Sequence, residues 1–485
     1  MPKKIVLVGL GFHARHHYLP LLGDVVRRHE AQLVGVVDIE DRRPHVEKAL
    51  REAGLAPAHF LGLRSVDPLA QAEALTRLSR LKAEQGCDGL IVSTDPRNHL
   101  PYLTWGALED VDVLVDKPLS ALAMDFSPEA ARKLTDDFQS IRDLFAHSTA
   151  SATIMVTRRA HDGYLMARRI LHDVAAEFGV PITFLNTYHA NGYWNFPDEF
   201  RSRENHPYKY GFGALLHGGY HVVDLAAWLL SVNKEALQDD WADRMEVLTQ
   251  HATPDDFLEQ IPQAVYDRFG LGREMQAPFS QAGRYFAQSC GETDVNISFS
   301  ARRDERVITM GSIQVMETAL STRAWRNLSE DTYKDNGRHS QERITVHMGH
   351  LLTMHIEDYR PLPRDADPQG LAPARFVIRV LRNSRLIGGE PYSEHVLTPH
   401  PSAQGGGTDS LTERSRRKTF QRWITGAGRA AAALETHELS IRLLTAAHEC
   451  MSRRRRGLAP MTSFPIGTPA PSPEAKPMSW GSARV

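Results

Sequence analysis

The chain has 485 residues, of which 42% are hydrophobic and 24% charged, as in soluble globular proteins of two or three domains. The formal net charge of −2 gives no reason to expect nucleic acid or an anionic membrane surface as a partner. Three widely spaced cysteines point to neither a disulfide framework nor a thiolate metal site, and no apolar run approaches the ~20 residues that span a bilayer. We therefore expect a cytoplasmic protein without a membrane or metal partner.

Residues 4–120 alternate between strand and helix patterns. The strands are short, continuous apolar runs, which is typical of parallel strands that helices cover on both faces. This order predicts a doubly wound parallel sheet, the α/β part of the fold. Strands are expected at residues 5–8, 33–37, 89–93 and 113–115, and helices at 12–22, 42–53 and 69–84.

The pattern changes after a helical stretch near residues 128–147. Period-2 alternation then dominates, which indicates half-buried strands. We expect an α+β domain with an open, mainly antiparallel sheet, followed by helices at 414–424 and 435–453. Residues 233–290 have the character of an insertion, and the Pro- and Ser-rich end at 456–485 that of a disordered tail. The other expected elements are a strand at 152–157, a helix at 161–178 and strands at 181–189, 294–300, 307–316, 344–356 and 376–381.

A glycine-rich turn follows the first strand. Gly9, Gly11 and Ala14 form the pattern Gly-x-Gly-x-x-Ala, which opens a helix directly after an apolar strand. In this context Gly9 permits a tight turn, Gly11 lets the backbone approach a pyrophosphate, and Ala14 allows the helix to pack closely on the strand. The free amides at the helix N-terminus would bind the phosphates. A glycine turn in another kind of α/β domain is the alternative; the strand and helix around the pattern favour dinucleotide binding.

Asp38 ends the second predicted strand. A carboxylate at this position accepts hydrogen bonds from a ribose 2′-hydroxyl and repels a 2′-phosphate, which favours NAD. Arg42 and Arg43 follow closely and would neutralise such a phosphate. We predict NAD as the cofactor, with NADP as the alternative.

Asp116, Lys117 and Pro118 follow the apolar strand at 113–115. Ligands of open α/β sheets bind at the carboxyl ends of the strands, so Lys117 is expected in the cofactor crevice, with its direction fixed by Pro118. An ammonium group there can polarise a substrate hydroxyl or carbonyl group. By itself, a lysine at a strand end is more often a solvated surface charge.

The segment from Gly213 to Asp224 carries two histidines among glycines. His217 and His221 share a helical face if a helix begins near residue 216, because residues i and i+4 are neighbours. Histidine suits the general base of an alcohol oxidation, since its ordinary pKa lies near neutrality. The same spacing occurs in metal sites, but the sequence lacks the HExxH pattern. A buried histidine bonded to the backbone is the third interpretation.

In this order, the three segments resemble the glucose–fructose oxidoreductase / inositol dehydrogenase (Gfo/Idh/MocA) family over roughly residues 4–455. Asp116-Lys117-Pro118 matches the family's Glu-Lys-Pro motif, with one carboxylate exchanged for another. The family's second motif is Gly-Gly-x-x-x-Asp-x-Gly-x-His-x-x-Asp, and this chain matches it at Gly213, Gly219, His221 and Asp224. The other similar segments are residues 157–159, 405–407 and 435–453.

The resemblance implies a Rossmann domain that binds NAD(P) at residues 1–148, and at 149–455 an α+β substrate domain whose open sheet forms dimer or tetramer contacts between copies of the chain. The activity would be hydride transfer between nicotinamide and a secondary alcohol or ketone of a sugar, cyclitol or similar small molecule. Lys117 would orient the substrate hydroxyl, and His221 would be the general acid/base. The cofactor-binding residues would be Gly9, Gly11, Phe12, His13, Ala14, Asp38, Ser93, Thr94, Asn98, His99, Asp116 and Lys117. The substrate-binding residues would be Tyr164, Asn191, Tyr193, Arg203 and His217.

His217, the third residue of the expected catalytic set, stands where the family usually has Asp. An imidazole removes a fixed negative charge, so we expect a lowered pKa of His221. This departure keeps two other functions open. One is an NAD-dependent glycosidase or lyase that works through transient oxidation, because such family members carry a His-Gly element in this region. The other is a catalytically silent member that binds nucleotide or sugar.

Overall fold

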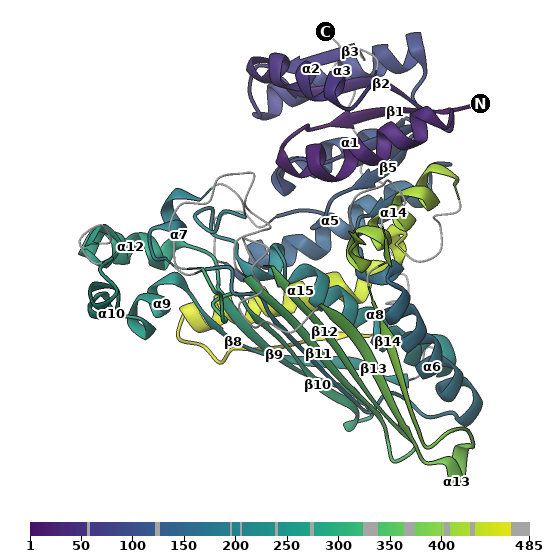
Figure 1. Cartoon of the computed structure of the whole chain (residues 1–485), viewed down its shortest axis with the longest axis vertical. Coiled ribbons are helices and arrows are strands. Elements are labelled where there is room, and N and C mark those ends of the chain that lie inside the picture. Colours follow the sequence, from purple (N-terminus) through teal and green to yellow (C-terminus); the bar gives the residue numbers. More distant parts are fainter. Residues whose placement is uncertain are drawn as a thin grey trace, which may run out of the picture.

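Two large sheets build the molecule, one above the other in Figure 1. The smaller sheet lies in the N-terminal domain, and the larger one carries helices on one of its faces. The α/β plus α+β fold class expected from the sequence is confirmed. Within the described ranges, every helix is too short or too polar to serve as a membrane span. The computed structural model describes residues 1–55, 59–121, 127–194, 196–203, 206–237, 241–271, 276–323, 338–362, 374–398, 400–401, 408–426 and 432–466.

The N-terminal sheet has six parallel strands in the order β3-β2-β1-β4-β5-β6. Its central strands are almost completely buried because helices pack on both faces. The strand order reverses between β1 and β4, which places a crevice at the carboxyl ends of the strands. The strands are β1 (Lys3–Val8), β2 (Ala31–Ile39), β3 (His59–Leu63), β4 (Gly89–Val92), β5 (Asp112–Val115) and β6 (Ala152–Ile154), and the helices are α1 (Phe12–Arg27), α2 (Arg43–Glu52), α3 (Pro68–Gln85), α4 (His99–Leu108) and α5 (Pro128–Ala146).

The first sheet includes a strand that lies after residue 148, the boundary expected from the sequence. Strand β6 pairs with β5 and completes the first sheet. Helix α14 (Leu411–Ile424) returns from the C-terminal part of the chain, and its Phe420 and Trp423 join the core formed by α1 and β1. Side chains from the C-terminal part of the chain therefore pack in the core of the N-terminal domain and connect the two domains.

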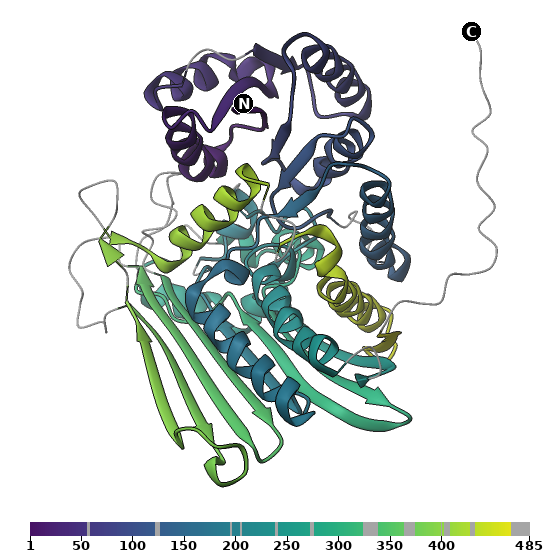
Figure 2. The same ribbon diagram turned by 90° about the vertical axis from the view of Figure 1, so that its right-hand side faces the viewer.

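The second sheet has nine strands in the order β14-β13-β12-β11-β7-β10-β9-β8-β17. Neighbours are antiparallel except β7 and β10, which run parallel. Helices α6 (Asp162–Phe178), α8 (Tyr220–Leu237) and α15 (Glu438–Arg455) cover one face (Figure 2), while alternate side chains on the other face stay half-exposed. The strands are β7 (Phe184–Ala190), β8 (Arg244–Ala252), β9 (Asp294–Arg303), β10 (Arg306–Met316), β11 (Arg338–Met348), β12 (Leu352–Leu362), β13 (Arg375–Arg382), β14 (Tyr392–Leu397) and β17 (Met461–Pro465).

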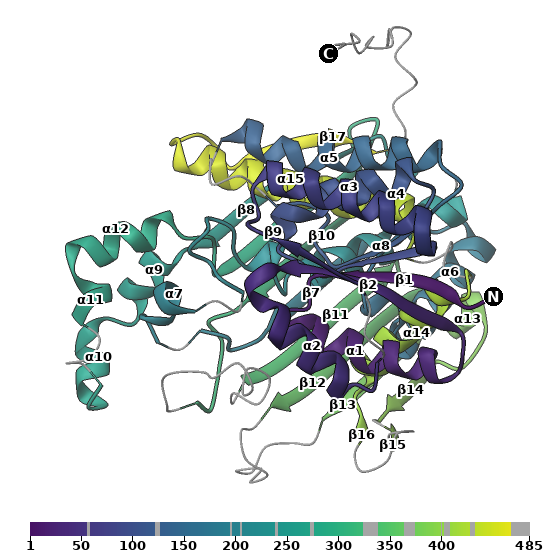
Figure 3. The same ribbon diagram turned by 90° about the horizontal axis from the view of Figure 1, so that it is seen from above.

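Three segments differ from the sequence expectation. The single strand expected at 344–356 is the hairpin of β11 and β12, because Gly349 turns the chain with a φ of +55°. The expected insertion at 233–290 begins within α8, contributes strand β8 to the sheet and carries a lateral group of short helices (Figure 3). Within the expected tail, β17 pairs with β8, while residues 467–485 lie outside the described ranges. The helices of the lateral group are α9 (Pro254–Gln260), α10 (Gln263–Arg268), α11 (Gln276–Phe279) and α12 (Gln281–Ser289).

Candidate active site

A cavity of about 1130 Å³ lies between the carboxyl ends of the N-terminal strands and one end of the nine-stranded sheet. Both domains contribute to its wall. From the N-terminal domain the expected site residues on the wall are Gly9, Gly11, Phe12, His13, Asp38, Ser93, Thr94, Asn98, Asp116 and Lys117. From the second domain they are Tyr164, Asn191, Tyr193, Arg203, His217 and His221.

The glycine turn after β1 packs against the loop that follows β4. Gly9 has a φ of +82°, and a Cβ at this position would lie 2.4 Å from the backbone oxygen of Ser93, so only glycine fits. At Gly11, in contrast, an added Cβ would meet no atom within 4 Å. No side chain caps the N-terminus of α1, which leaves its first amide groups and the positive end of the helix dipole available to an anion. This space and these donors fit a pyrophosphate.

Asp38 lies at the end of β2 and holds the glycine turn. Its Oδ2 accepts a 2.8 Å hydrogen bond from the amide of Leu10, and its Oδ1 accepts one of 2.7 Å from Ile39. The Nε of Arg42 is 3.8 Å from the Asp38 carboxylate, and both residues line the cavity. Arg43 instead pairs with Glu40. Of the two arginines considered for a 2′-phosphate, only Arg42 is therefore placed beside Asp38.

Asp116 and Lys117 follow β5 and line the middle of the cavity. The Asp116 carboxylate accepts hydrogen bonds from the hydroxyls of Tyr18 at 2.5 Å and Ser93 at 2.6 Å. The ammonium of Lys117 donates a 2.7 Å hydrogen bond to the backbone oxygen of His217. Burial lowers the pKa of Lys117 to about 8, although the negative charge of Asp116 opposes this effect.

His217 does not share a helix with His221, so the i, i+4 arrangement expected from the sequence is wrong. Helix α8 begins only at Tyr220, and His217 has non-helical φ and ψ of −101° and −115°. The chain bends at Gly219, where a Cβ would lie 2.7 Å from the backbone oxygen of Ala214. The His217 ring stacks on Tyr208 with centroids 5.2 Å apart, and its backbone oxygen meets Lys117.

Both imidazoles are neutral at neutral pH. Burial, and then the positive charge of Lys117, lowers the pKa of His217 to about 3. The same two causes, in the same order, hold the pKa of His221 well below its usual value. Among the groups present, burial and nearby cations lower the pKa of His221. The His221 Nδ1 has no hydrogen-bond partner within the described part of the chain.

The candidate substrate residues come from several elements of the second domain. Asn191 directly follows β7, and its amide donates a 3.2 Å hydrogen bond to Glu317. Tyr193 places its hydroxyl 3.1 Å from the Nδ1 of His206, and the Arg203 guanidinium stacks 3.7 Å above the Tyr193 ring. The hydroxyl of Tyr164 is bonded to the buried carboxylate of Glu342, so this tyrosine contributes mainly its ring to the wall.

Two expected cofactor residues lie off the cavity wall. Ala14 is fully buried in α1 against the sheet. His99 is also fully buried, with its ring nitrogens 2.9 and 3.1 Å from the backbone oxygens of Pro118 and Thr94. It therefore joins the loops after β4 and β5. In the described ranges, no group of three or more His, Cys, Asp or Glu residues is placed to hold a metal ion.

The sequence analysis missed several ionisable residues, in or next to strands of the second sheet, that reach the cavity. Their strands meet at one end: β7 and β10 end there, β11 begins there and β12 ends there. Nothing in a single strand's pattern signals such convergence, because the sheet pairing brings the residues together. The missed residues on the wall are His189, Glu317, Arg338, Asp358 and Arg360.

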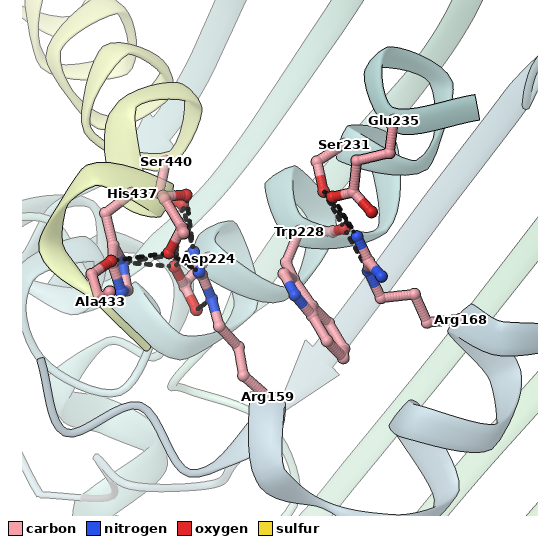
Figure 4. Close-up of polar contacts among 10 residues, drawn as sticks. Arg159, Arg168, Asp224, Trp228, Ser231, Glu235, Ala433, His437 and Ser440 are labelled. Atoms are coloured by element: carbon pink, nitrogen blue, oxygen red, sulfur yellow. Dashed lines mark hydrogen bonds and ion pairs between the residues drawn. The ribbon is translucent and has the colours of Figure 1, made fainter. Parts of the chain in front are cut away.

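Asp224, the last residue of the second motif, lies outside the cavity in a buried network (Figure 4). Its two carboxylate oxygens accept hydrogen bonds of 2.6 and 2.9 Å from Arg159. His437 and Ser440 approach the same carboxylate at 3.0 and 2.8 Å. Although burial opposes it, the charge of Arg159 keeps the pKa of Asp224 far below its usual value. The network fixes the helix that carries His221 against α15 and the turn at residues 158–160.

No protein-family model matches the sequence, and no curated protein sequence matches it. Solved structures share its fold. An oxidoreductase from Agrobacterium radiobacter in complex with NAD+, L-tartaric acid and magnesium has a TM-score of 0.58 at 13% identity, over 96% of this chain and 99% of that one. The WlbA dehydrogenase from Bordetella pertussis, in complex with NADH and UDP-GlcNAcA, has a TM-score of 0.53 at 14% identity, over 96% and 99% of the two chains.

A levoglucosan dehydrogenase in complex with NADH and levoglucosan is similar in the same way. Its TM-score is 0.54 at 11% identity, over 96% of this chain and 100% of that chain. At these identities the similarity shows that the whole two-domain architecture is shared.

Proposed function

We propose that this protein is an NAD-dependent oxidoreductase of the Gfo/Idh/MocA type, which transfers hydride between nicotinamide and a secondary alcohol or ketone of a sugar, cyclitol or similar small molecule. The observation that carries the proposal is the single cavity that joins the glycine turn and Asp38 to Lys117 and His221. Two of the similar solved structures are complexes with a nicotinamide cofactor and a small molecule, one with NAD+, L-tartaric acid and magnesium and the other with NADH and levoglucosan. NADP is the alternative cofactor, because Arg42 lies beside Asp38.

The N-terminal wall would hold the dinucleotide. Gly11 and the first amides of α1 would bind the pyrophosphate, and Asp38 the adenosine ribose. Ser93, Thr94 and Asn98 line the same cavity as Lys117 and would contact the nicotinamide half. When bound, the nicotinamide supplies the hydride acceptor or donor.

Lys117 and His221 would handle the reacting hydroxyl. The Lys117 ammonium would donate a hydrogen bond to the substrate oxygen and stabilise the negative charge that develops there. The neutral imidazole of His221 would accept the hydroxyl proton during oxidation and return it during reduction. His217 would hold Lys117 through its backbone oxygen while its ring closes the wall beside Tyr208.

The function is tested on purified protein. The protein is analysed for nicotinamide that copurifies with it and is screened with NAD+ or NADP+ against sugars, cyclitols and their ketones, with NADH or NADPH formation as the readout. Aryl glycosides are screened in parallel. Net cofactor reduction supports the proposal. Release of the aglycone without net reduction would replace it with a glycosidase or lyase, and nucleotide binding without either reaction would identify a silent binding protein.

We also propose that the protein is cytoplasmic and forms a homo-oligomer through the uncovered face of the second sheet. Along β10 this face carries the exposed Met310 and the half-exposed Ser312 and Gln314, whereas Ile313 and Val315 point to the helices. Light scattering of the full chain tests the oligomer. Replacement of Met310 and Gln314 by arginine should dissociate it, and a monomeric wild-type protein would refute it.

A further inference from the structure

We propose that Glu317 is a positioning residue of the active site, whose carboxylate stabilises the charged ammonium of Lys117. The proposal deepens the proposed function, because it assigns a role at the same site to a residue that the sequence motifs do not contain. It starts from the place of Glu317 in the sheet.

The backbone of Glu317 is fixed at the end of β10. The parallel strands β7 and β10 end side by side, so that the amide of Asn191 donates to the backbone oxygen of Met316 at 2.9 Å. The next amides, those of Tyr193 and Trp194, donate to the backbone oxygen of Glu317 at 2.6 and 3.1 Å. The direction of the Glu317 side chain is therefore set by the pairing of two strands.

The carboxyl group lies beneath the loop that carries His217. Glu317 is 2% exposed and lines the cavity. Its Oε2 accepts the hydrogen bond from Asn191, whereas its Oε1 is buried without a hydrogen-bond partner within the described ranges. A Cβ added at Gly218 would lie 3.1 Å from this Oε1. The carboxyl group thus packs against Gly218, the residue next to His217.

Lys117 reaches the same loop from the other domain. Its Nζ contacts the backbone oxygen of His217, so the ammonium and the carboxyl group touch consecutive residues. The two groups form no direct ion pair in the described structure, and Glu317 acts on Lys117 through space. This separation leaves the ammonium free to donate to a ligand while the negative charge still stabilises it.

Other charges surround the pair. Lys117 also faces the negative charge of Asp116 and the positive charges of Arg158 and Arg416. Glu317 faces Arg338 from β11, Asp294 from β9 and Arg203. Burial raises the pKa of Glu317 to about 7, so its negative charge develops through neutral pH and is largely present in the alkaline range where Lys117, with a pKa of about 8, loses its proton.

The test measures the pKa of Lys117 without a substrate. The full chain is labelled competitively with acetic anhydride at a series of pH values, and the peptide that contains Lys117 is quantified by mass spectrometry. In Glu317→Gln we expect the pKa of Lys117 to fall by roughly 0.5 to 1 on the pH scale, because an opposite charge is removed. In Glu317→Asp, which keeps the charge, most of that decrease should disappear.

Asp95→Asn is the matched control. Asp95 is a carboxylate on the same cavity wall, and it pairs with Arg97. An unchanged pKa of Lys117 in Glu317→Gln, or an equal decrease in Asp95→Asn, would overturn the proposal. If Glu317→Gln does not fold, the reciprocal measurement takes its place. In Lys117→Met, the pKa of Glu317 from carboxyl carbon-13 NMR should rise, and an unchanged value would overturn the proposal as well.

The result is independent of the proposed function. If no sugar or cyclitol is oxidised, the pKa measurements still decide whether Glu317 controls Lys117. If one is oxidised, Glu317→Gln should lose activity at a lower pH than the wild type, and NADH affinity should stay within about twofold, because Glu317 lies in the second domain.

Discussion

The ammonium of Lys117 donates a 2.7 Å hydrogen bond to the backbone oxygen of His217. This contact joins the end of β5 in the N-terminal domain to the loop before α8 in the second domain. It brings the two segments that the sequence separates by 100 residues to one point of the cavity wall. The candidate chemistry depends on this contact between domains.

Lys117→Met should abolish most of the turnover and leave the nucleotide bound. We expect a decrease of about 10²- to 10⁴-fold in kcat/KM, because the donor to the reacting oxygen is lost. NADH affinity, measured by fluorescence titration, should change by less than about threefold. Lys48→Met, on the exposed side of α2, serves as the control. Activity close to that of the wild type would remove Lys117 from the mechanism.

The two glycines of the turn should respond in opposite ways. Gly11→Val should leave the free energy of unfolding nearly unchanged, because the added side chain meets open space, yet weaken NADH binding by at least about tenfold. Gly9→Ala should destabilise the fold, because its Cβ would collide with the backbone of Ser93. Urea unfolding and fluorescence titration separate the two effects. Unimpaired NADH binding by a folded Gly11→Val protein would contradict the cofactor site.

Asp38→Ala should weaken NAD binding more than NADP binding. The loss of a carboxylate that accepts from the ribose costs about 1–3 kcal/mol, whereas a 2′-phosphate gains from the removal of a negative charge beside Arg42. Isothermal titration with both nucleotides measures the ratio. Glu40→Ala, which removes an exposed carboxylate paired with Arg43, is the control. An unchanged preference would refute the assignment of Asp38 to the ribose.

Asp224→Asn should destabilise the protein strongly. Arg159 would remain buried without its charged partner, and breaking such a pair costs roughly 3–5 kcal/mol. Ser440→Ala removes one neutral donor from the same carboxylate and should cost about 1 kcal/mol. Urea unfolding of the wild type and both variants tests this order. Equal losses of the free energy of unfolding in the two variants would show that the ion pair stabilises the fold no more than the hydrogen bond from Ser440.

Buried neutral histidines should make stability fall in acid. Burial lowers the pKa of His448 from 6.5 to about 3, so its contribution to the free energy of unfolding is present above pH 6.5 and is lost as pH falls toward 3. In His448→Phe, the slope of that free energy against pH between pH 4 and 6 should decrease by roughly 1.4 kcal/mol per pH unit. His350→Asn, which removes an exposed histidine, is the control variant. An unaltered slope in His448→Phe would show that this histidine is not neutral in the folded state.

Much of the N-terminal domain follows from local sequence. Continuous apolar runs and the glycine pattern act within one strand, one turn and one helix, so Gly9, Gly11 and Asp38 could be placed on the cavity without a structure. Strand β3 was not predicted, because its sequence HFLGL contains a glycine and only a short apolar pattern.

The second domain was less predictable, and the reason is physical. Its sheet joins strands that are distant in the chain, and register and pairing are not encoded in any single strand. His217 and His221 were expected on one helix, but the contact of Gly219 with the backbone of Ala214 delays the start of α8.

The order of an α/β and an α+β part, the glycine-rich turn after β1 and the lysine at the end of β5 can be read from the sequence, since each depends on neighbouring residues. The surroundings of that lysine follow from the tertiary structure alone. The pairing of β7 with β10 brings Glu317 to the cavity, and the packing of the two domains brings His217 to Lys117. Burial in this common wall then lowers the pKa values of Lys117 and the two histidines, because desolvation depends on the complete set of neighbours and not on the motif.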